Sequence, residues 1–168
     1  MPSPSKGPWR ATRLFDDGEV VVVSFGSLLA SRWSDTAKPA QVEGMYGHIR
    51  GLSDAVGGKI SMLNVIDAID PTLGGFESRN TSANILRDLG ELIVAQAYVM
   101  LGPEVVLGDH KGTVHSVNQI SRTTIPTGVF HNLAAGCAWL DAMPGVRTRG
   151  YPRIPVGDIA RELELRGA

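Results

Sequence analysis

The chain has 168 residues, of which 43% are hydrophobic and 20% charged, the size and composition of one soluble globular domain. Sixteen Lys and Arg residues against seventeen Asp and Glu residues give a formal net charge of -1, so the positive surface of a nucleic-acid-binding protein is not expected. No segment approaches the roughly 18 apolar residues of a membrane-spanning helix, and the single cysteine, Cys137, cannot form an internal disulfide. We therefore expect a cytoplasmic protein that neither binds nucleic acid nor inserts into a membrane.

The first elements predicted along the chain are a flexible arm and an antiparallel hairpin. Residues 1–8 contain three prolines and little that could be buried, which is typical of an arm. Trp9–Phe15 and Glu19–Phe25 are strand-like, and the residues between them, Asp-Asp-Gly, supply the positive φ angles of a tight turn. In the connector that follows, Trp33 is either an exposed anchor for another protein or a side chain folded over the sheet.

Helices and strands then alternate. Pro39–Val56 has apolar residues three and four positions apart, which predicts a one-faced helix. Ile60–Asp67 is mostly apolar and β-branched over the length of a strand, the pattern of a strand covered on both faces. The same reasoning predicts a helix from about Asn80, a strand at Ala95–Leu101, a helix at Gly108–Ser121, a strand at Ile125–Phe130, a helix from Asn132 through Met143 and a last helix at Val156–Leu165.

This order of elements predicts the α/β class. We expect a mixed sheet of about five strands with four helices over residues 9–143, followed by a C-terminal tail with a short helix at residues 144–168. The connections between parallel strands should be right-handed helical crossovers, and the opening hairpin should contribute the antiparallel pair.

The stretch from Ile60 to Ile93 is where we expect a binding site. A strand followed by the start of a helix is where α/β proteins bind anions and small ligands, because free backbone N–H groups and the helix dipole point there. The candidate phosphoacceptors are Ser78, Thr81 and Ser82, and the candidate partner-binding or ligand-binding residues are Asp67, Asp70, Gly74, Gly75, Phe76, Arg79 and Asn80. The alternative is that the hydroxyl groups only cap the helix and the two aspartates only turn the loop.

Residue patterns typical of catalytic or metal sites are not found. His110 and His115 are five residues apart, which is the wrong spacing for one helical face. Cys137 has apolar neighbours, which raise the pKa of a thiol and predict a packed core cysteine. The glycine pairs lack the spacing of a dinucleotide fingerprint or a P-loop. We therefore expect no catalytic residue, no metal and no cofactor.

Two alternatives to a non-enzymatic role stay open. One is a small-molecule-binding or nucleotide-binding module whose pocket lies at the carboxyl ends of the central strands, near Asp67 and Asp70. The other is an enzyme that uses one of these aspartates together with His110 or His115.

Three stretches of the chain, with the element order, carry a resemblance to a known family. They are Glu19–Phe25, Ile60–Asp67 with the hydroxyl-bearing turn and helix behind it, and Val129–Leu140, which looks like the family's last strand and helix. Over about residues 9–143 the chain resembles the STAS domain, the fold of bacterial anti-sigma-factor antagonists. In those antagonists a phosphorylatable Ser or Thr stands at the start of the second helix, and the closest positional match here is Ser78.

The resemblance implies a regulatory or adaptor domain. Such a domain would bind a protein partner through its second helix and the loop before that helix. Phosphorylation of Ser78, Thr81 or Ser82 would place about -2 charge at this surface and release the partner. The identity of the partner and the formation of a homodimer are left open.

Overall fold

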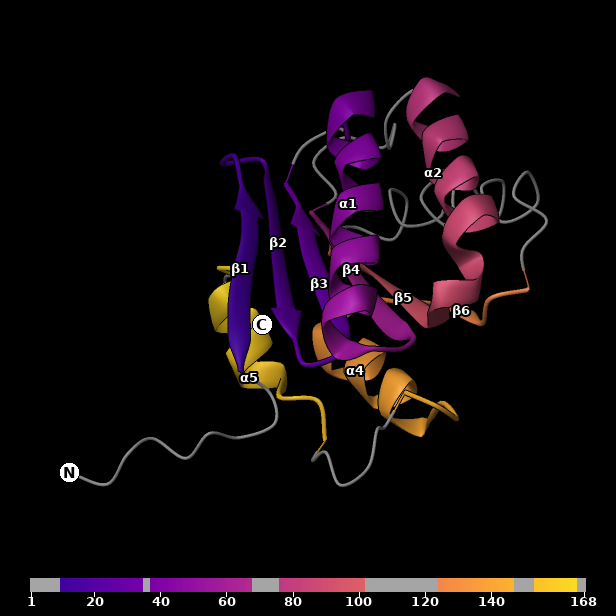
Figure 1. The fold of residues 1–168 in the computed structure, drawn as a ribbon. Helices are drawn as coiled ribbons and strands as arrows, with labels where there is room; N and C mark the ends of the chain where they lie inside the picture. The colour runs from indigo at the N-terminus through magenta and orange to yellow at the C-terminus, as the bar shows by residue number, and fades with distance from the viewer. Residues whose placement is uncertain (1–9, 35–36, 68–75, 102–123, 147–152, 166–168) are drawn as a thin grey trace.

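The structure, a computed structural model, describes residues 10–34, 37–67, 76–101, 124–146 and 153–165. Its centre is a six-stranded mixed sheet in which the strands lie side by side in chain order (Figure 1). Neighbouring strands are antiparallel from β1 to β3 and parallel from β3 to β6. The strands are β1 Ala11–Asp16, β2 Val20–Phe25, β3 Leu28–Trp33, β4 Ile60–Asp67, β5 Ile93–Leu101 and β6 Thr127–Phe130.

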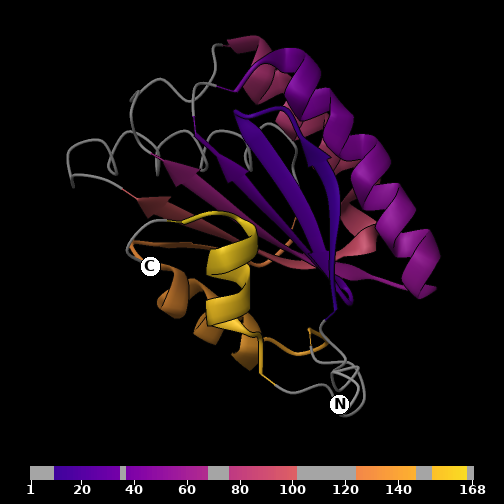
Figure 2. The ribbon, with the colours of Figure 1, turned by 90° about the vertical axis from the view of Figure 1, so that its left-hand side faces the viewer.

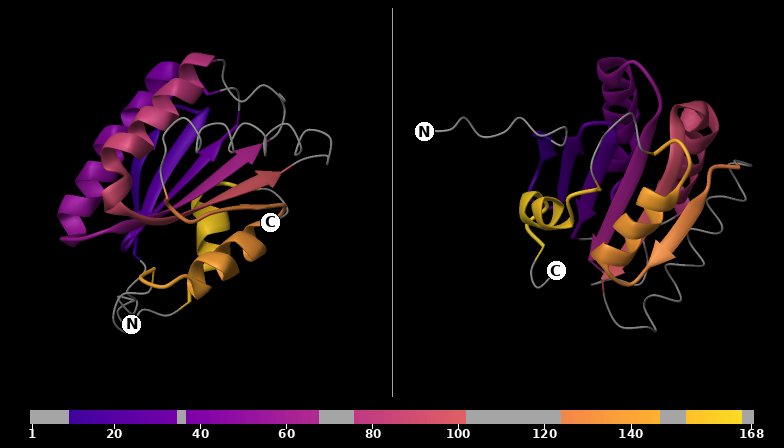
Figure 3. Two further views of the ribbon diagram at one scale, coloured as in Figure 1. Left: turned by 90° about the vertical axis from the view of Figure 1, so that its right-hand side faces the viewer. Right: turned by 90° about the horizontal axis from the view of Figure 1, so that it is seen from below.

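Four α-helices of the described residues cover the two faces of this sheet. They are α1 Pro39–Val56, α2 Phe76–Leu89, α4 Leu133–Ala142 and α5 Val156–Glu162, and a short 3-10 helix, η1 at Gly90–Leu92, joins α2 to β5. Figure 2 shows α1 and α2 on one face and α4 and α5 on the other. In Figure 3, α5 lies below the β1 side of the sheet and α4 below the β5 side. The domain is therefore a sandwich with the sheet as its middle layer.

Each face of the sheet carries its own apolar core. Because successive side chains of a strand point to opposite faces, β4 contributes Met62 and Ile66 to the core under α1 and α2. The same strand contributes Leu63 and Val65 to the core under α4 and α5. The prediction that Ile60–Asp67 is a strand covered on both faces is thus confirmed.

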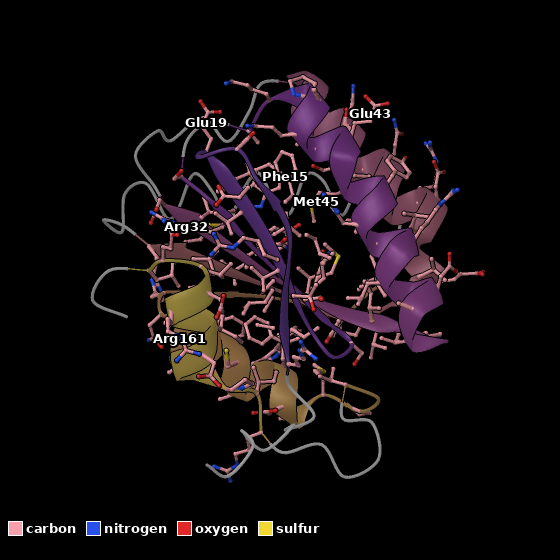
Figure 4. The ribbon with its side chains drawn as sticks, turned by 60° about the vertical axis from the view of Figure 1, so that its left-hand side comes forward. Phe15, Glu19, Arg32, Glu43, Met45 and Arg161 are labelled. Carbon is pink, nitrogen blue, oxygen red and sulfur yellow. The ribbon has the colours of Figure 1, made fainter. Side chains whose placement is uncertain are left out.

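Helix α1 has the bounds that the sequence predicts. Its buried residues Val42, Met45 and Ile49 recur at three and four positions and face the sheet. Figure 4 shows Met45 on the inner side of α1, on the same side of the sheet as Phe15 of β1. The helix ends at Gly57, whose φ of 67° lies in the left-handed region that glycine adopts without strain.

The prediction of about five strands is wrong, because the chain turns back directly after Phe25 and forms β3. The loop between β2 and β3 contains only Gly26 and Ser27, and Phe25 pairs with Leu28 across it. Gly26 has a φ of 55°, which suits the first position of such a two-residue hairpin loop.

Trp33 is the last residue of β3 and is not an exposed anchor. Its side chain is 8% exposed, belongs to the core under α1 and α2, and donates its indole N–H to Ser31 Oγ at 2.9 Å. Of the two interpretations of Trp33, the one that folds it over the sheet is confirmed.

Helix α2 begins at Phe76, and the predicted start at about Asn80 is wrong. Asn80, Thr81 and Ser82 therefore lie inside the helix, where they cannot act as N-caps. Packing of the apolar residues that follow them outweighs their weak helix propensity.

The remaining predicted elements differ from the structure mainly at their ends, where helix and strand boundaries are least defined. Asn132 caps α4 as predicted, because its Oδ1 accepts the backbone N–H of Ala135 at 2.8 Å. The helix predicted at Gly108–Ser121 lies outside the described residues.

The C-terminal residues 153–165 close the core under α4 and α5. Ile154, Ile159 and Leu163 are at most 4% exposed and pack with Val21 and Val23 of β2. Removal of these three side chains from water stabilises the fold, since a fully buried aliphatic side chain contributes about 1.5–3 kcal/mol.

Candidate functional site

Of the candidate residues that the structure describes, Asp67 ends β4 at the carboxyl end of the parallel strands, and Asn80, Thr81 and Ser82 lie in α2, the helix that follows β4 in the chain (Figure 1). Ligands of open α/β sheets bind at this end of the strands. The structure describes the side chains of Asp67, Asn80, Thr81 and Ser82. Of Phe76, Ser78 and Arg79 it describes only that they lie in α2, and Asp70, Gly74 and Gly75 are outside the described residues.

Asp67, the last residue of β4, is engaged by Arg32 of the neighbouring strand. Arg32 Nε and Nη2 donate to Asp67 Oδ2 at 3.0 and 2.9 Å, and each side chain is 23% exposed. Arg32 Nη1 also donates to the carbonyl oxygens of Leu163 and Glu164, at 3.3 and 3.2 Å, where α5 ends. Figure 4 shows Arg32 close to α5. Asp67 therefore neutralises the arginine that fastens α5 to the sheet.

Helix α2 has one face in the core and another in solvent. Ala83, Ile85, Leu86 and Leu89 are at most 5% exposed and pack in the core that also contains α1. The opposite face carries polar residues at helical spacing, with the first half-buried and the others exposed. We call these residues the outer stripe: Asn80, Asn84, Arg87 and Asp88.

The three candidate phosphoacceptors occupy different positions in α2. Thr81 and Ser82 are half-buried and lie three to four residues before Ile85, which places them toward the apolar face. Ser78 is the third residue of the helix, in the first turn, where free backbone N–H groups and the dipole favour negative charge. Ser78 is therefore the candidate whose backbone position suits a phosphate.

A hydrogen bond between helices fixes the outer stripe on α1. Tyr46 Oη donates to Asp88 Oδ2 at 3.0 Å, and Arg87 Nε lies 3.3 Å from the other oxygen of Asp88. Burial, together with the hydrogen bond to Asp88, raises the pKa of Tyr46. The phenol therefore stays a donor at neutral pH.

Charged groups also gather at the start of α1, next to the turn between β1 and β2. Lys38 Nζ lies 2.8 Å from Glu19 Oε2, while Gln41 Nε2 donates to Asp17 Oδ2 and Glu19 Oε2 at 3.0 and 2.9 Å. The backbone N–H of Val20 and the Gln41 side chain lower the pKa of Asp17, and Lys38 and Gln41 lower the pKa of Glu19. These partners tie the turn to α1, which is a structural role.

A row of polar side chains beneath α1 and α2 was not predicted. Ser31 of β3, Asn64 of β4 and Tyr98 of β5 are register partners, and Gln96 of β5 pairs with Thr127 of β6. Ser31, Asn64 and Gln96 are 0%, 6% and 0% exposed. A polar residue on the inward face of an apolar strand needs a partner, so their positions within apolar segments are the signal that could have found them.

Among the described residues, no group of three or more His, Cys, Asp or Glu side chains could hold a metal ion. Cys137 is buried, as predicted, and burial raises its pKa to about 12, so it is a thiol at neutral pH. His110 and His115, which the enzymatic alternative requires, lie outside the described residues.

Two findings concern the chain as a whole. Within the described ranges, no helix is both long enough and apolar enough to span a bilayer. Comparisons with family models, with curated proteins and with solved structures find no match for this chain.

Proposed function

We propose that this chain is a STAS-like regulatory or adaptor domain that acts in the cytoplasm without catalysis and binds a protein partner through α2 and the loop before it. The observation that supports this proposal is the outer stripe, a polar helix face whose opposite side is packed in the core. A partner meets a surface that is already ordered, so it loses little binding free energy to conformational entropy.

The chemistry of the outer stripe fits a protein partner. Asp88 is already bonded to Tyr46 and to Arg87 Nε, so the groups left for a partner are the amides of Asn80 and Asn84 and the terminal nitrogens of Arg87, whose side chain is 59% exposed. Arginine is enriched among the residues that dominate protein interfaces, and amides supply directional hydrogen bonds. A partner with an acidic group opposite Arg87 and a polar rim is the complementary surface.

Phosphorylation of Ser78 is the proposed regulation. A phosphate in the first turn of α2 adds about -2 charge, which the helix dipole favours. The same charge repels an acidic partner that approaches Arg87 further along the helix. Phosphorylation therefore keeps α2 folded and weakens partner binding.

The binding surface is tested with two matched pairs of substitutions. Asn84→Arg with Arg87→Glu changes the outer stripe, while Ala134→Arg with Ala138→Glu makes a similar change at exposed positions of α4, on the other face of the sheet. Partners are captured from a cell extract, identified by mass spectrometry and measured with purified partner by calorimetry. The α2 pair should weaken binding at least tenfold, and the α4 pair should not. Equal binding by both pairs contradicts the proposed surface.

The switch is tested separately at Ser78. Ser78→Asp should reduce recovery of the same partner, and Ser78→Ala should preserve it. Thr81→Asp and Ser82→Asp serve as comparisons, because both residues lie beyond the first turn. If Ser78→Asp and Ser78→Ala recover equal amounts, phosphorylation is not the regulation, whatever the outcome for the outer stripe.

A further inference from the structure

A line of side-chain hydrogen bonds in two parts crosses the sheet beneath α1 and α2. Both parts run from the β3 side of the sheet toward the β6 side. In the first part, Trp33 Nε1 donates to Ser31 Oγ at 2.9 Å, and Ser31 Oγ donates to Asn64 Oδ1 at 2.9 Å. The indole nitrogen can only donate, so the hydroxyl of Ser31 accepts there and directs its own proton to Asn64. Because Asn64 binds Ser31 through its Oδ1, the NH₂ group of Asn64 does not bind Ser31.

The second part of the line begins on the next strand and runs in the same direction. Tyr98 Oη donates to Gln96 Oε1 at 3.4 Å, and Gln96 Nε2 donates to Thr127 Oγ1 at 3.0 Å. Thr127 Oγ1 then donates to the carbonyl oxygen of Ile125 at 3.0 Å. Tyr98 thus donates its proton on the side of β6, and the lone pairs of its oxygen remain to accept a hydrogen bond.

The two parts stop at neighbouring residues. Asn64 and Tyr98 are register partners on the parallel strands β4 and β5, whose backbones run about 4.8 Å apart. Asn64 is 6% exposed, and its Nδ2 has no acceptor among the described residues. A buried, unpaired amide donor is costly, and native proteins seldom leave one. A donor and an acceptor therefore stand side by side with no bond between them.

We propose that a hydroxyl group binds between Asn64 and Tyr98 and completes this line. A hydroxyl can accept a hydrogen bond from Asn64 Nδ2 and donate its own proton to Tyr98 Oη with a single oxygen atom. A carbonyl or ether oxygen has no proton to donate, and an ammonium group has no lone pair with which to accept. The hydroxyl belongs either to a buried water molecule or to a small alcohol or polyol.

The surroundings favour a neutral group. The same face of the sheet carries Met62, Ile66 and Met100 in its core, and burying a charge among apolar side chains is costly. Burial raises the pKa of Tyr98 to about 12, so its phenol keeps its proton at neutral pH. Tyr98 and Thr127 have intermediate exposure, whereas Ser31 is 0% exposed.

The water arm of the test uses nuclear magnetic resonance on ¹⁵N-labelled protein. A long-lived water molecule on Asn64 should give cross-relaxation between the water signal and the side-chain amide protons of Asn64. The side-chain amide of Gln96 is the internal control, because it is also buried but donates to Thr127. Tyr98→Phe removes the acceptor and should abolish the Asn64 signal without changing that of Gln96.

The ligand arm uses thermal unfolding with glycerol, erythritol and myo-inositol as probes and 1,2-dimethoxyethane as an ether without hydroxyl groups. Polyols stabilise most proteins by being excluded from their surface, so the measurement is the difference in midpoint shift between native protein and variant. A bound polyol should give a larger shift for the native protein than for Tyr98→Phe or Asn64→Leu, and Glu43→Gln, at an exposed position of α1, should behave as the native protein. The ether should show no such difference.

A positive result in either arm supports the hydroxyl site and identifies the source of the hydroxyl. The proposal is overturned if neither the water signal nor a variant-dependent shift is found, or if an experimental structure shows Asn64 Nδ2 bonded directly to Tyr98 Oη. Tyr98→Phe removes a single oxygen atom, so it decides the question even if Asn64→Leu does not fold. None of these outcomes depends on whether α2 binds a protein partner.

Discussion

At the scale of single residues, two weakly acidic groups whose pKa is raised by burial lie on opposite faces of the sheet. Tyr98 packs against the core under α1 and α2, and Cys137 belongs to the core under α4 and α5. Burial raises the pKa of Tyr98 from 10.0 and that of Cys137 from 9.0, each to about 12. The folded protein therefore keeps two protons that the unfolded chain releases at lower pH.

We predict that the free energy of unfolding decreases as the pH rises from about 9 to about 12, the window that these two pKa shifts define. Below pH 9 both groups are protonated in both states, so their contribution is fully present. Above that pH the unfolded state binds fewer protons than the folded state. Stability is therefore lost until both groups also titrate in the folded state. Urea unfolding at several pH values measures this decline.

Tyr98→Phe and Cys137→Ala should each make the decline less steep. Ala138→Ser, at an exposed position of α4, is the control and should leave the slope unchanged. If all four proteins show the same slope, the alkaline loss of stability comes from other groups.

The sequence predicts some of these residue environments and not others. The burial of Cys137 follows from its apolar neighbours in the chain, which are visible in the sequence. The environment of Asn64 depends on Ser31 and Tyr98, more than 30 residues away on either side, and on the register that makes them neighbours. Local patterns do not contain that register.

At the scale of elements, Arg32 joins three of them. It binds Asp67 at the end of β4 and the carbonyl oxygens of Leu163 and Glu164 at the end of α5, while it stands itself on β3. Cations near the last carbonyl groups of a helix also interact favourably with its dipole. Arg32 is therefore a fastening point between the sheet and α5.

Arg32→Ala should lower the free energy of unfolding by about 2–3 kcal/mol, because a partly buried carboxylate and two carbonyl groups lose a charged donor. Asp67→Asn should cost less, about 1 kcal/mol, since Arg32 keeps its bonds to α5. Arg87→Ala removes an exposed arginine with an exposed ion pair and should change stability by no more than about 0.5 kcal/mol. Urea unfolding measures all three. Equal losses in Arg32→Ala and Arg87→Ala would contradict the fastening role.

The elements with the strongest sequence signals are those that the sequence predicts with the correct bounds. Pro39–Val56 has a proline at its start, a glycine after its end and one apolar face, and Ile60–Asp67 is continuously apolar. By contrast, β3 was missed although Gly26-Ser27 is a typical two-residue hairpin loop, because Ser31 and Arg32 interrupt the apolar pattern of the strand. A strand whose polar residues are paired inside the protein cannot be recognised by periodicity alone.

At the scale of the whole molecule, the core under α4 and α5 is built from both ends of the chain. Ile159 and Leu163 of the C-terminal segment are 0% exposed and pack in one cluster with Val21 and Val23 of β2. The predicted boundary after residue 143 follows from the resemblance and from composition. The contribution of residues 153–165 to the core depends on long-range packing, which neither the resemblance nor the composition reveals.

Leu163→Ala should lower the free energy of unfolding by about 2–5 kcal/mol, the usual cost of removing a fully buried leucine side chain. Leu14→Ala is the matched control: Leu14 is 38% exposed and should cost well under half as much. Deletion of residues 153–168 should go further and abolish the cooperative unfolding transition. A deleted protein that unfolds with the native denaturant dependence would show that the segment is dispensable.

The order of the strands in the sheet has a consequence for how the protein folds during synthesis. Each strand pairs with the next one along the chain, so the sheet can grow strand by strand as the chain leaves the ribosome. Helix α5 is the exception, because it returns from the far end of the sheet to the first three strands. Until it arrives, the growing sheet exposes apolar side chains of β2 to the cell, and its arrival is the step that ends that aggregation hazard.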